Sequence, residues 1–525
     1  MSAMRSTGIL LFFVYGLHLP QVYAQDIAAA ATPMAVVNVN LVDVAAGQVV
    51  PDQSVLISGQ RIIFVGDLDS SGIEPDTFVV NGDGLYLVPG FWDMHAHLAY
   101  PGAELISGPA MVANGVMYAR DMSGDCIGEE CSEQKDITGM RDLESKIETG
   151  QVLGPELVAI GSYAVEGPNI AYGELGRPRV PSFLAPRTES QGRSLARYMS
   201  DRGVDFIKSY DSIPFPAYMG MISEATLLKL PVAGHVPKSI LLIEAIEAGQ
   251  RTVDHARMLP LACSAVEEVF RDDYTAWLDA DIQRTTSKHN TDAKQLPEIA
   301  MWAYYRAVLD EFDDQKCQRY IREWAGTDVH YVPTHVTRQA ETIMHFRAFF
   351  ADPRLRYVNE EAVAEWEESA AFYSARFAAH PGAEQNYLDY HLRSLQLTGR
   401  AYRAGVKILV GTDVGDTLIY PGFSFHDELG LLADAGMPPD AVLRSATLLA
   451  AAFSGRDATE GTITAGKTAN FVLLRANPLL DIGNTKSIEA VHYMDRFYDR
   501  SALDAILTAV ASAANGLQVP QVGDK

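Results

Sequence analysis

The sequence predicts an α/β protein: a TIM (β/α)8 barrel joined to a small β-sandwich that is built from the N- and C-terminal segments of the chain. A length of 525 residues is too great for one simple core. Residues 89–455 alternate short apolar strands with helical stretches, which is typical of a parallel α/β fold. Residues 33–88 and 456–500 instead alternate apolar and polar residues between Gly and Asp turns, which predicts antiparallel strands.

The first 24 residues have the parts of an export signal. Arg5 supplies a positive charge, residues 9–17 form a short apolar core, and residues 22–24 have the small-residue character of a cleavage site. The apolar core is too short to span a bilayer comfortably, although an N-terminal membrane anchor is the alternative interpretation. We therefore expect residues 1–24 to be a signal peptide and the protein to be periplasmic or secreted.

Both ends of the chain contribute to the predicted sandwich. Residues 35–39 are expected to form one strand, and residues 53–57 and 61–65 should pair around the turn at 58–60. Near the C-terminus, residues 470–474 repeat the pattern of a short apolar strand. Because these segments flank the long middle part, we expect one small β domain that is assembled from both ends.

The middle of the chain carries eight candidate strands, each a short apolar run. They are residues 89–95, 115–121, 155–161, 204–210, 231–236, 252–255, 330–335 and 407–413. Eight strands that alternate with helices indicate a TIM barrel, whose active site lies at the carboxyl ends of its strands. Residues 264–328 and 337–403 have aromatic and charged residues at helical spacing, so we expect a helical insertion and further helical cover at that face.

The composition limits the class of partner. The net charge of −25 argues against nucleic acid and against an anionic membrane. We expect a small-molecule or short-peptide substrate and no stable membrane association after signal cleavage. The sequence leaves a homo-oligomer open.

The chain has four cysteines, and an exported protein can form disulfide bonds between them. Cys126 and Cys131 enclose a short loop, and a bond between Cys263 and Cys317 would clamp the insertion. Four cysteines allow three connectivities, and four unpaired buried thiols are the alternative.

The strand at residues 89–97 ends in a His-x-His motif. Residues i and i+2 of a strand point to the same face, so His95 and His97 can direct two imidazoles at one point. A divalent metal requires such a convergence of ligands. Taken alone, the motif fits structural histidines equally well.

Four more metal-compatible residues lie near the ends of predicted strands: Lys208, His235, His255 and Asp413. Each alone is more often structural, and Lys208 alone would be read as a solvated edge residue. Together with the His-x-His pair they predict one site. A lysine ammonium has no lone pair, but carboxylation by CO2 converts it into a ligand that bridges two cations.

Three further motifs accompany this set. Residues 115–121 read Gly-Val-Met-Tyr-Ala-Arg-Asp, residues 425–447 begin with Phe-His-Asp-Glu-Leu and end with Ala-Thr, and residues 461–472 include Gly-Lys-Thr-Ala-Asn-Phe-Val. With the six strand-end residues, they resemble the amidohydrolase superfamily of metal-dependent hydrolases, and most closely its imidazolonepropionase-like and prolidase-like branch. The resemblance covers roughly residues 33–262 and 328–482.

The resemblance implies two divalent cations, most often zinc, and assigns a role to each ligand. His95, His97 and Asp413 would hold the α metal, His235 and His255 would hold the β metal, and carboxylated Lys208 would bridge the two metals together with a hydroxide. Two cations acidify the bridging water and polarise a substrate carbonyl. Asp413 would accept the proton of that hydroxide and pass it to the leaving amine.

Other residues near the predicted strand ends are candidates for substrate contact. Tyr210 lies two residues beyond Lys208 and shares its face, and His335 stands at the end of the seventh strand. For Arg120 a buried ion pair is the favoured interpretation and a substrate carboxylate the alternative. Asn470 departs from the usual Asp of the superfamily, and the insertion has no counterpart there.

These observations predict an exported, binuclear, metal-dependent amidohydrolase that cleaves an amide bond of a peptide or an N-acyl amino acid. Hydrolysis of a lactone, an ester or a cyclic amide on the same site is one alternative, because the same hydroxide attacks any polarised carbonyl. A non-catalytic barrel that binds a metal or a solute is the other. It is disfavoured because Lys208 and Asp413 are both present.

Overall fold

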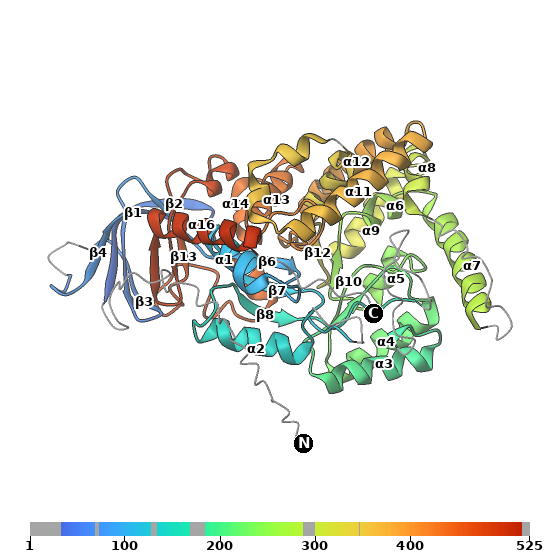
Figure 1. Cartoon of the computed structure of the whole chain (residues 1–525), viewed down its shortest axis with the longest axis horizontal. Helices are drawn as coiled ribbons and strands as arrows, with labels where there is room; N and C mark the ends of the chain where they lie inside the picture. The colour runs from blue at the N-terminus through green and yellow to red at the C-terminus, as the bar shows by residue number, and fades with distance from the viewer. Residues whose placement is uncertain are drawn as a thin grey trace, which may run out of the picture.

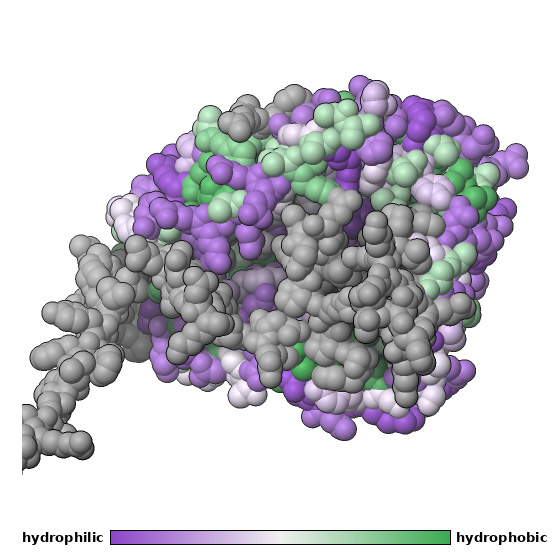
Figure 2. Space-filling model, turned by 45° about the vertical axis from the view of Figure 1, so that its right-hand side comes forward, coloured by the Kyte–Doolittle hydropathy of each residue, from purple (hydrophilic) through white to green (hydrophobic). Residues whose placement is uncertain are grey.

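The computed structural model describes residues 33–68, 73–127, 134–167, 184–286, 300–345 and 347–516. The expected signal peptide lies outside these ranges. In the described part of the chain, no helix has both the length and the apolar character needed to cross a membrane. Figure 1 shows the β-rich part at one end of an elongated molecule and long helices at the other. The face in Figure 2 is largely hydrophilic, with apolar residues in small groups.

The two ends of the chain build one sheet, as expected. Its strands are β1 (Met34–Asp43), β2 (Gln48–Ser58), β3 (Arg61–Gly66), β4 (Phe78–Asn81), β5 (Tyr86–Pro89), β13 (Phe471–Leu474), β14 (Ile488–Tyr493) and β15 (Arg496–Asp499). The order is β15-β14-β13-β5-β1-β2-β3, with β4 beside β1. The two halves meet where Phe471 of β13 lies opposite Pro89 of β5. The sandwich boundaries 33–88 and 456–500 stay a prediction.

Seven of the eight predicted middle strands are present, some shortened. They are β6 (Phe91–Ala96), β7 (Val116–Asp121), β8 (Glu156–Ile160), β9 (Ile207–Ser209), β10 (Val232–Gly234), β11 (Thr252–Asp254) and β12 (His330–Val332). The first three form one parallel sheet and the other four a second, in chain order. All residues of β6 and β7 are buried, as expected for parallel strands covered on both faces.

The prediction of a continuous eighth strand at residues 407–413 is wrong. This segment makes only isolated parallel bridges, from Ile408 to Tyr331 and from Val414 to Ala96. The left-handed backbone of Asp413, with φ 64°, interrupts the extended conformation just before the second bridge. The parallel segments are accordingly assigned to two sheets and not to one closed barrel.

Helices follow the strands and cover the sheets. They are η2 (Ala103–Ser107), α1 (Gly108–Ala113), α2 (Ile137–Glu148), α3 (Glu189–Arg202), α4 (Phe215–Leu228), α5 (Leu242–Glu247), α6 (Met258–Ala262), α13 (Phe423–Asp434), α14 (Pro439–Ser445), α15 (Leu448–Phe453), η8 (Ile482–Lys486) and α16 (Arg500–Gly516). Local signals fix their ends. The side chain of Thr188 caps α3 in a capping box with Gln191, and Gly203 ends it with φ 81°.

Most described residues of the expected insertion and of the later cover lie in helices. The elements are α7 (Glu267–Thr286), η5 (Met301–Tyr304), α8 (Tyr305–Asp310), α9 (Asp314–Ala325), α10 (His335–Ile343), η6 (Arg347–Ala351), η7 (Pro353–Tyr357), α11 (Glu360–Ala379) and α12 (Ala383–Ala404). Residues 287–299 of the insertion lie outside the described ranges.

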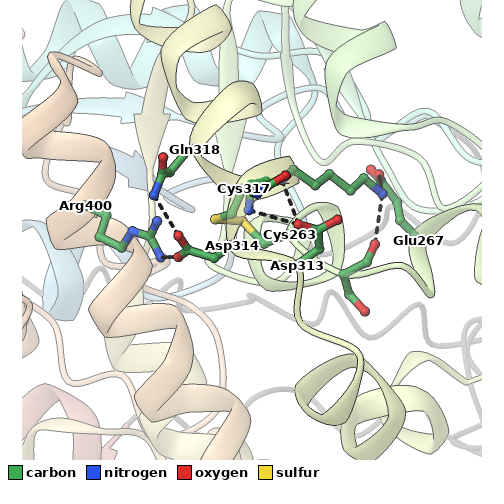
Figure 3. Close-up of a disulfide and its surroundings, with 10 residues drawn as sticks. Cys263, Glu267, Asp313, Asp314, Cys317, Gln318 and Arg400 are labelled. Carbon is green, nitrogen blue, oxygen red and sulfur yellow. Dashed lines mark hydrogen bonds and ion pairs between the residues drawn. A yellow bond between two sulfur atoms is a disulfide. The ribbon is translucent and has the colours of Figure 1, made fainter.

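The predicted disulfide between Cys263 and Cys317 is present. It joins the end of α6 to α9, next to the ion pair of Lys316 with Glu267 at 2.8 Å (Figure 3). Arg400 of α12 reaches Asp314 of α9 at 2.8 Å in the same region. The insertion is thus tied to both its own base and the later helical cover.

The other predicted bond, between Cys126 and Cys131, involves a residue outside the described ranges, so it stays a prediction.

Removing the Cys263–Cys317 bond should destabilise the insertion. The bond closes a loop with a sequence separation of 54 residues, which corresponds to about 4 kcal/mol of loop-closure entropy. We expect the Cys263→Ser, Cys317→Ser double variant to lose most of this free energy, measured by native-state proteolysis of the segment. Under reducing agent the difference from the natural protein should vanish. Equal protection of both proteins without reductant would contradict the prediction.

Candidate metal centre

The structure brings the six predicted ligand residues to one edge of the parallel strands. His95 lies in β6 and Lys208 in β9, while the remaining four follow a strand or its equivalent: His97 after β6, His235 after β10, His255 after β11 and Asp413 in the segment that bridges β12 and β6. Each side chain is therefore positioned by the end of a parallel segment, where a site is expected in such folds.

Asp413 stands at the centre of the first group of ligands. Its Oδ1 lies 2.9 Å from His97 Nε2 and 3.3 Å from His95 Nε2. Potential ligand atoms of these three residues all lie within 4.8 Å of one another. Lys208 Nζ lies 3.2 Å from His95 Nε2, so the lysine reaches the same point.

The second pair of histidines adjoins this group. The ring centroids of His235 and His255 are 4.5 Å apart, and the His255 ring lies 4.7 Å from that of His95. His255 Nδ1 is 3.6 Å from Asp413 Oδ2. All six predicted ligands thus form one cluster, in which a carboxylate and an amine are surrounded by four imidazoles.

Each of the four imidazoles has a partner at Nδ1. The contacts are His95 with Asp254 Oδ2 at 2.9 Å, His97 with Ser123 Oγ at 3.0 Å, His235 with Asp211 Oδ1 at 2.5 Å and His255 with Thr334 Oγ1 at 2.7 Å. A partner at one ring nitrogen orients the ring and leaves the other nitrogen for a metal. The four Nε2 atoms are therefore the ones left to act as ligands.

Two of these partners are themselves held by cations. The buried Arg120 places Nη2 3.3 Å from Asp254 Oδ2, and Lys238 Nζ lies 3.0 Å from Asp211 Oδ2. The favoured interpretation of Arg120 as half of a buried ion pair agrees with this contact. Neither Asp254 nor Asp211 was predicted as a partner from the sequence, although each carboxylate lies close in sequence to a predicted ligand.

Backbone conformation also marks the site. His255 and Asp413 have φ values of 65° and 64°, and Thr334, which contacts His255, has a φ of 44°. Residues other than glycine adopt this left-handed region at a cost of about 1–3 kcal/mol each, and such strain is concentrated at functional sites. Here it turns the side chains at the strand ends toward the cluster.

Burial favours the neutral imidazole of His235 and of His255, whereas Asp413 is held in its charged form. Burial lowers the pKa of His235 to about 4 and that of His255 well below its usual value. Burial alone would raise the pKa of Asp413, but the attraction of His95 and His255 holds it well below the usual range. These are the protonation states in which both residue types bind metals.

Lys208 is 1% exposed, and this burial lowers the pKa of its ammonium. Asp254 and Asp413 attract the charged form and oppose the shift only in part. A lysine amine must lose its proton before it can react with CO2, and burial favours that loss.

The cluster opens into a cavity of about 470 Å³, here called the main cavity. His97, Lys208, His235, His255 and Asp413 line it.

Tyr210 also lines the main cavity, and its ring stacks on His235 with 4.0 Å between centroids. His335 is not brought to the main cavity: it is fully buried, and its Nε2 lies 2.9 Å from Thr398 Oγ1 of α12. The structure thus places only Tyr210 of the two expected substrate contacts beside the ligands.

Arg257 also faces the main cavity, although it was not predicted from the sequence as a site residue. Its Nη2 lies 3.2 Å from Glu341 Oε1, and Arg338 Nη1 lies 2.6 Å from the other oxygen of the same carboxylate. Two guanidinium groups share one carboxylate, so this wall has excess positive charge. Arg257 is separated from the ligand His255 by one residue, and that proximity was the available signal.

Comparison with known proteins gives one family match and several structures of similar fold. A sequence model of the amidohydrolase family matches residues 396–510. The whole structure is similar to bottromycin amidohydrolase, with 21% identity, a TM-score of 0.67 and coverage of 94% of this chain and 92% of that chain. A Xaa-Pro dipeptidase with bound methionine in its active site gives 15% identity, a TM-score of 0.60 and coverage of 89% and 100%.

Two further similarities extend the comparison. Molinate hydrolase gives 16% identity and a TM-score of 0.60, with coverage of 95% of this chain and 100% of that chain. An adenine deaminase from Rubrobacter xylanophilus is 41% identical over 58 residues, and the chain spans only 10% of that protein's length. The resemblance to the amidohydrolase superfamily is confirmed by the family match near the C-terminus and by the shared mixed α/β fold.

The Nδ1 partners provide a test of the metal site. Replacing Asp211 by asparagine removes the charge that orients His235, so zinc affinity should fall about 10- to 100-fold. Competition with a chromophoric chelator measures this affinity. Asp201→Asn, which changes an exposed carboxylate of α3, is the matched control and should leave zinc affinity unchanged. Equal affinities of both variants would mean that Asp211 does not support a metal ligand.

Proposed function

We propose that the protein is a metal-dependent amidohydrolase that cleaves the amide bond of a peptide or an N-acyl amino acid. The observation that carries this proposal is the convergence of four imidazoles, each held at Nδ1, on Asp413 and Lys208 beside the main cavity. Similarity to proteins named as an amidohydrolase and a dipeptidase supports the choice of a carbon–nitrogen bond.

The donor set fits two divalent cations. Neutral imidazoles and carboxylates suit zinc, and the buried Lys208 becomes a bridging carboxylate once it reacts with CO2. In this proposal His95, His97 and Asp413 would hold one ion, His235 and His255 would hold the other, and carboxylated Lys208 would serve as a ligand to both. When bound, the two ions supply an acidified water and an electrophilic contact for the substrate carbonyl.

The protein's own residues then position the substrate and move its proton. Asp413 is ionised and lies within hydrogen-bond distance of His97, so it is poised to accept a proton during attack and to return it to the leaving amine. Arg257 presents excess positive charge to the main cavity and is suited to bind the carboxylate of an amino-acid leaving group. Tyr210, stacked on His235, forms part of the same wall.

The scaffold of this site is proposed to be a closed (β/α)8 barrel. The bridge from Gly161 to Phe206 links the end of β8 to the start of β9. On the other side, Leu409 N donates to Tyr331 O of β12 and Met94 N of β6 donates to Val410 O. These contacts connect the two parallel sheets through the segment at 407–414 and would close the ring.

Export is a separate part of the proposal. The Cys263–Cys317 disulfide suits an oxidising compartment, which agrees with the signal-like character of residues 1–24. A protein that is exported and cleaves amides would act on peptides or N-acyl amino acids outside the cytoplasm.

The test combines metal analysis of residues 25–525 with hydrolysis of matched amide and ester substrates. About two equivalents of zinc together with cleavage of N-acyl amino acids or dipeptides would support the proposal. Two equivalents with cleavage only of esters, lactones or cyclic amides would select that alternative. Absence of metal after reconstitution with zinc and bicarbonate, and absence of hydrolysis, would favour a solute-binding barrel.

A further inference from the structure

A second cavity, here called the side lobe, adjoins the main cavity. It measures about 480 Å³, within the range of sites for small organic ligands. Both cavities are lined by His97, Tyr100, Trp366 and Asp416, so they meet beside a predicted metal ligand. Two metal ions and a water need only the volume among the six ligands, and the side lobe extends away from them.

The walls of the side lobe combine polar groups with several apolar side chains. Besides Tyr100 and Trp366, the apolar side chains are those of Ile106, Tyr357, Ile419 and Pro421. The walls are held by packing behind them: Trp366 meets Tyr420 edge-on at 5.4 Å, and Tyr357 stacks on Phe423 at 5.0 Å. A cavity with such walls binds aromatic and aliphatic groups by burying their surface.

The two cavities differ in the positive charge on their walls. Among the described residues that line the side lobe, none is lysine or arginine, whereas Glu361, Glu365 and Asp416 are acidic. The main cavity also has acidic residues, Glu365, Glu368, Asp413 and Asp416, but Lys208 and Arg257 line it as well, and Arg257 supplies positive charge that the described lining of the side lobe lacks. An anionic group is therefore favoured near Arg257 and disfavoured in the side lobe.

We propose that the side lobe binds a bulky aromatic or aliphatic substituent, without negative charge, on the acyl side of the scissile amide. This inference rests on the proposed function, in which Arg257 binds the carboxylate of the leaving amino acid. His97, one of the predicted ligands, lies where the two cavities meet, so a carbonyl held beside it can have its leaving group toward Arg257 and its acyl substituent toward the side lobe.

Three substrates with one leaving amino acid, such as leucine, test this assignment. They carry an acetyl, a phenylacetyl or a succinyl group. We expect kcat/KM for the phenylacetyl substrate to exceed that for the acetyl substrate by at least about tenfold. The succinyl substrate, whose acyl group ends in a carboxylate, should be the poorest of the three.

A substitution that fills the side lobe with a bulky side chain tests whether the preference for the phenylacetyl substrate arises there. Ala362 of α11 lines the side lobe but not the main cavity, whereas Ala364 of the same helix is exposed and lines neither. Ala362→Trp should lower kcat/KM for the phenylacetyl substrate at least about tenfold and leave the acetyl substrate within about twofold. Ala364→Trp is the matched control and should leave both values unchanged.

The outcomes separate this inference from the proposed function. Cleavage of the acetyl substrate without a preference for phenylacetyl in the natural protein would overturn the side-lobe assignment and leave amide hydrolysis standing. The side-lobe assignment would also be overturned if Ala362→Trp lowered kcat/KM equally for the phenylacetyl and acetyl substrates while circular dichroism showed that the variant was folded. Failure to cleave all three amides would overturn the proposed function and the inference together.

Discussion

Lys208→Ala is expected to lower kcat/KM by at least about 10³-fold, more than the 10- to 100-fold typical of a lost partner of a metal ligand. Lys208 is 1% exposed, and its Nζ lies 3.2 Å from His95 Nε2, at the centre of the cluster. Alanine leaves the two proposed metals without a bridge and opens a space lined by imidazoles. Metal content measured by atomic absorption should fall with the activity.

Chemical rescue distinguishes a bridging carboxylate from a lysine that only fills space. Formate, acetate or propionate should occupy the space left in Lys208→Ala and restore part of the activity and of the metal content. Lys146→Ala, which removes a partly exposed lysine of α2, is the control and should show neither loss nor rescue. Full activity of Lys208→Ala without added acid would remove Lys208 from the metal site.

The ligand cluster could be predicted from sequence because its geometry follows from strand ends. His95 and His97 share a face by the two-residue period, and parallel strands bring Lys208, His235 and His255 to the same edge. None of these positions depends on which loop packs against which. The ordering of the strands alone is enough to gather them.

The Nδ1 partners could not be predicted in this way. Asp254, the last residue of β11, precedes the ligand His255 in the chain but contacts His95 of β6. Ser123, in the loop after β7, reaches His97 at a sequence separation of 26. Such pairings depend on tertiary packing and leave no periodic signal.

Local backbone geometry explains the two other places where the structure differs from the sequence-based prediction, His335 and the expected strand at 407–413. His335 begins α10 after Thr334, whose φ of 44° turns the chain, and its ring enters the interior next to Thr398. An apolar run that ends in a polar residue does not reveal such a turn. Likewise, the apolar residues at 407–412 suggested a strand, but the segment makes only isolated bridges around the left-handed Asp413.

Asp413→Asn should separate metal binding from proton transfer. Asparagine keeps the shape and one oxygen ligand but cannot accept a proton at neutral pH. We expect kcat to fall about 10²- to 10⁴-fold, the range for loss of a general acid–base group. Because Asp413 Oδ1 lies within 3.3 Å of both His95 and His97, zinc affinity should also fall, but by a smaller factor than kcat.

Comparing the fall in kcat with the fall in zinc affinity decides the role of Asp413. If Asp413 served only as a metal ligand, the variant would lose activity in proportion to the metal that it loses. At saturating zinc the variant should therefore contain its full complement of metal and still turn over slowly. Asp434→Asn, which changes an exposed residue at the end of α13, is the control and should match the natural protein. Recovery of full kcat by Asp413→Asn at saturating zinc would assign the proton transfer to another group.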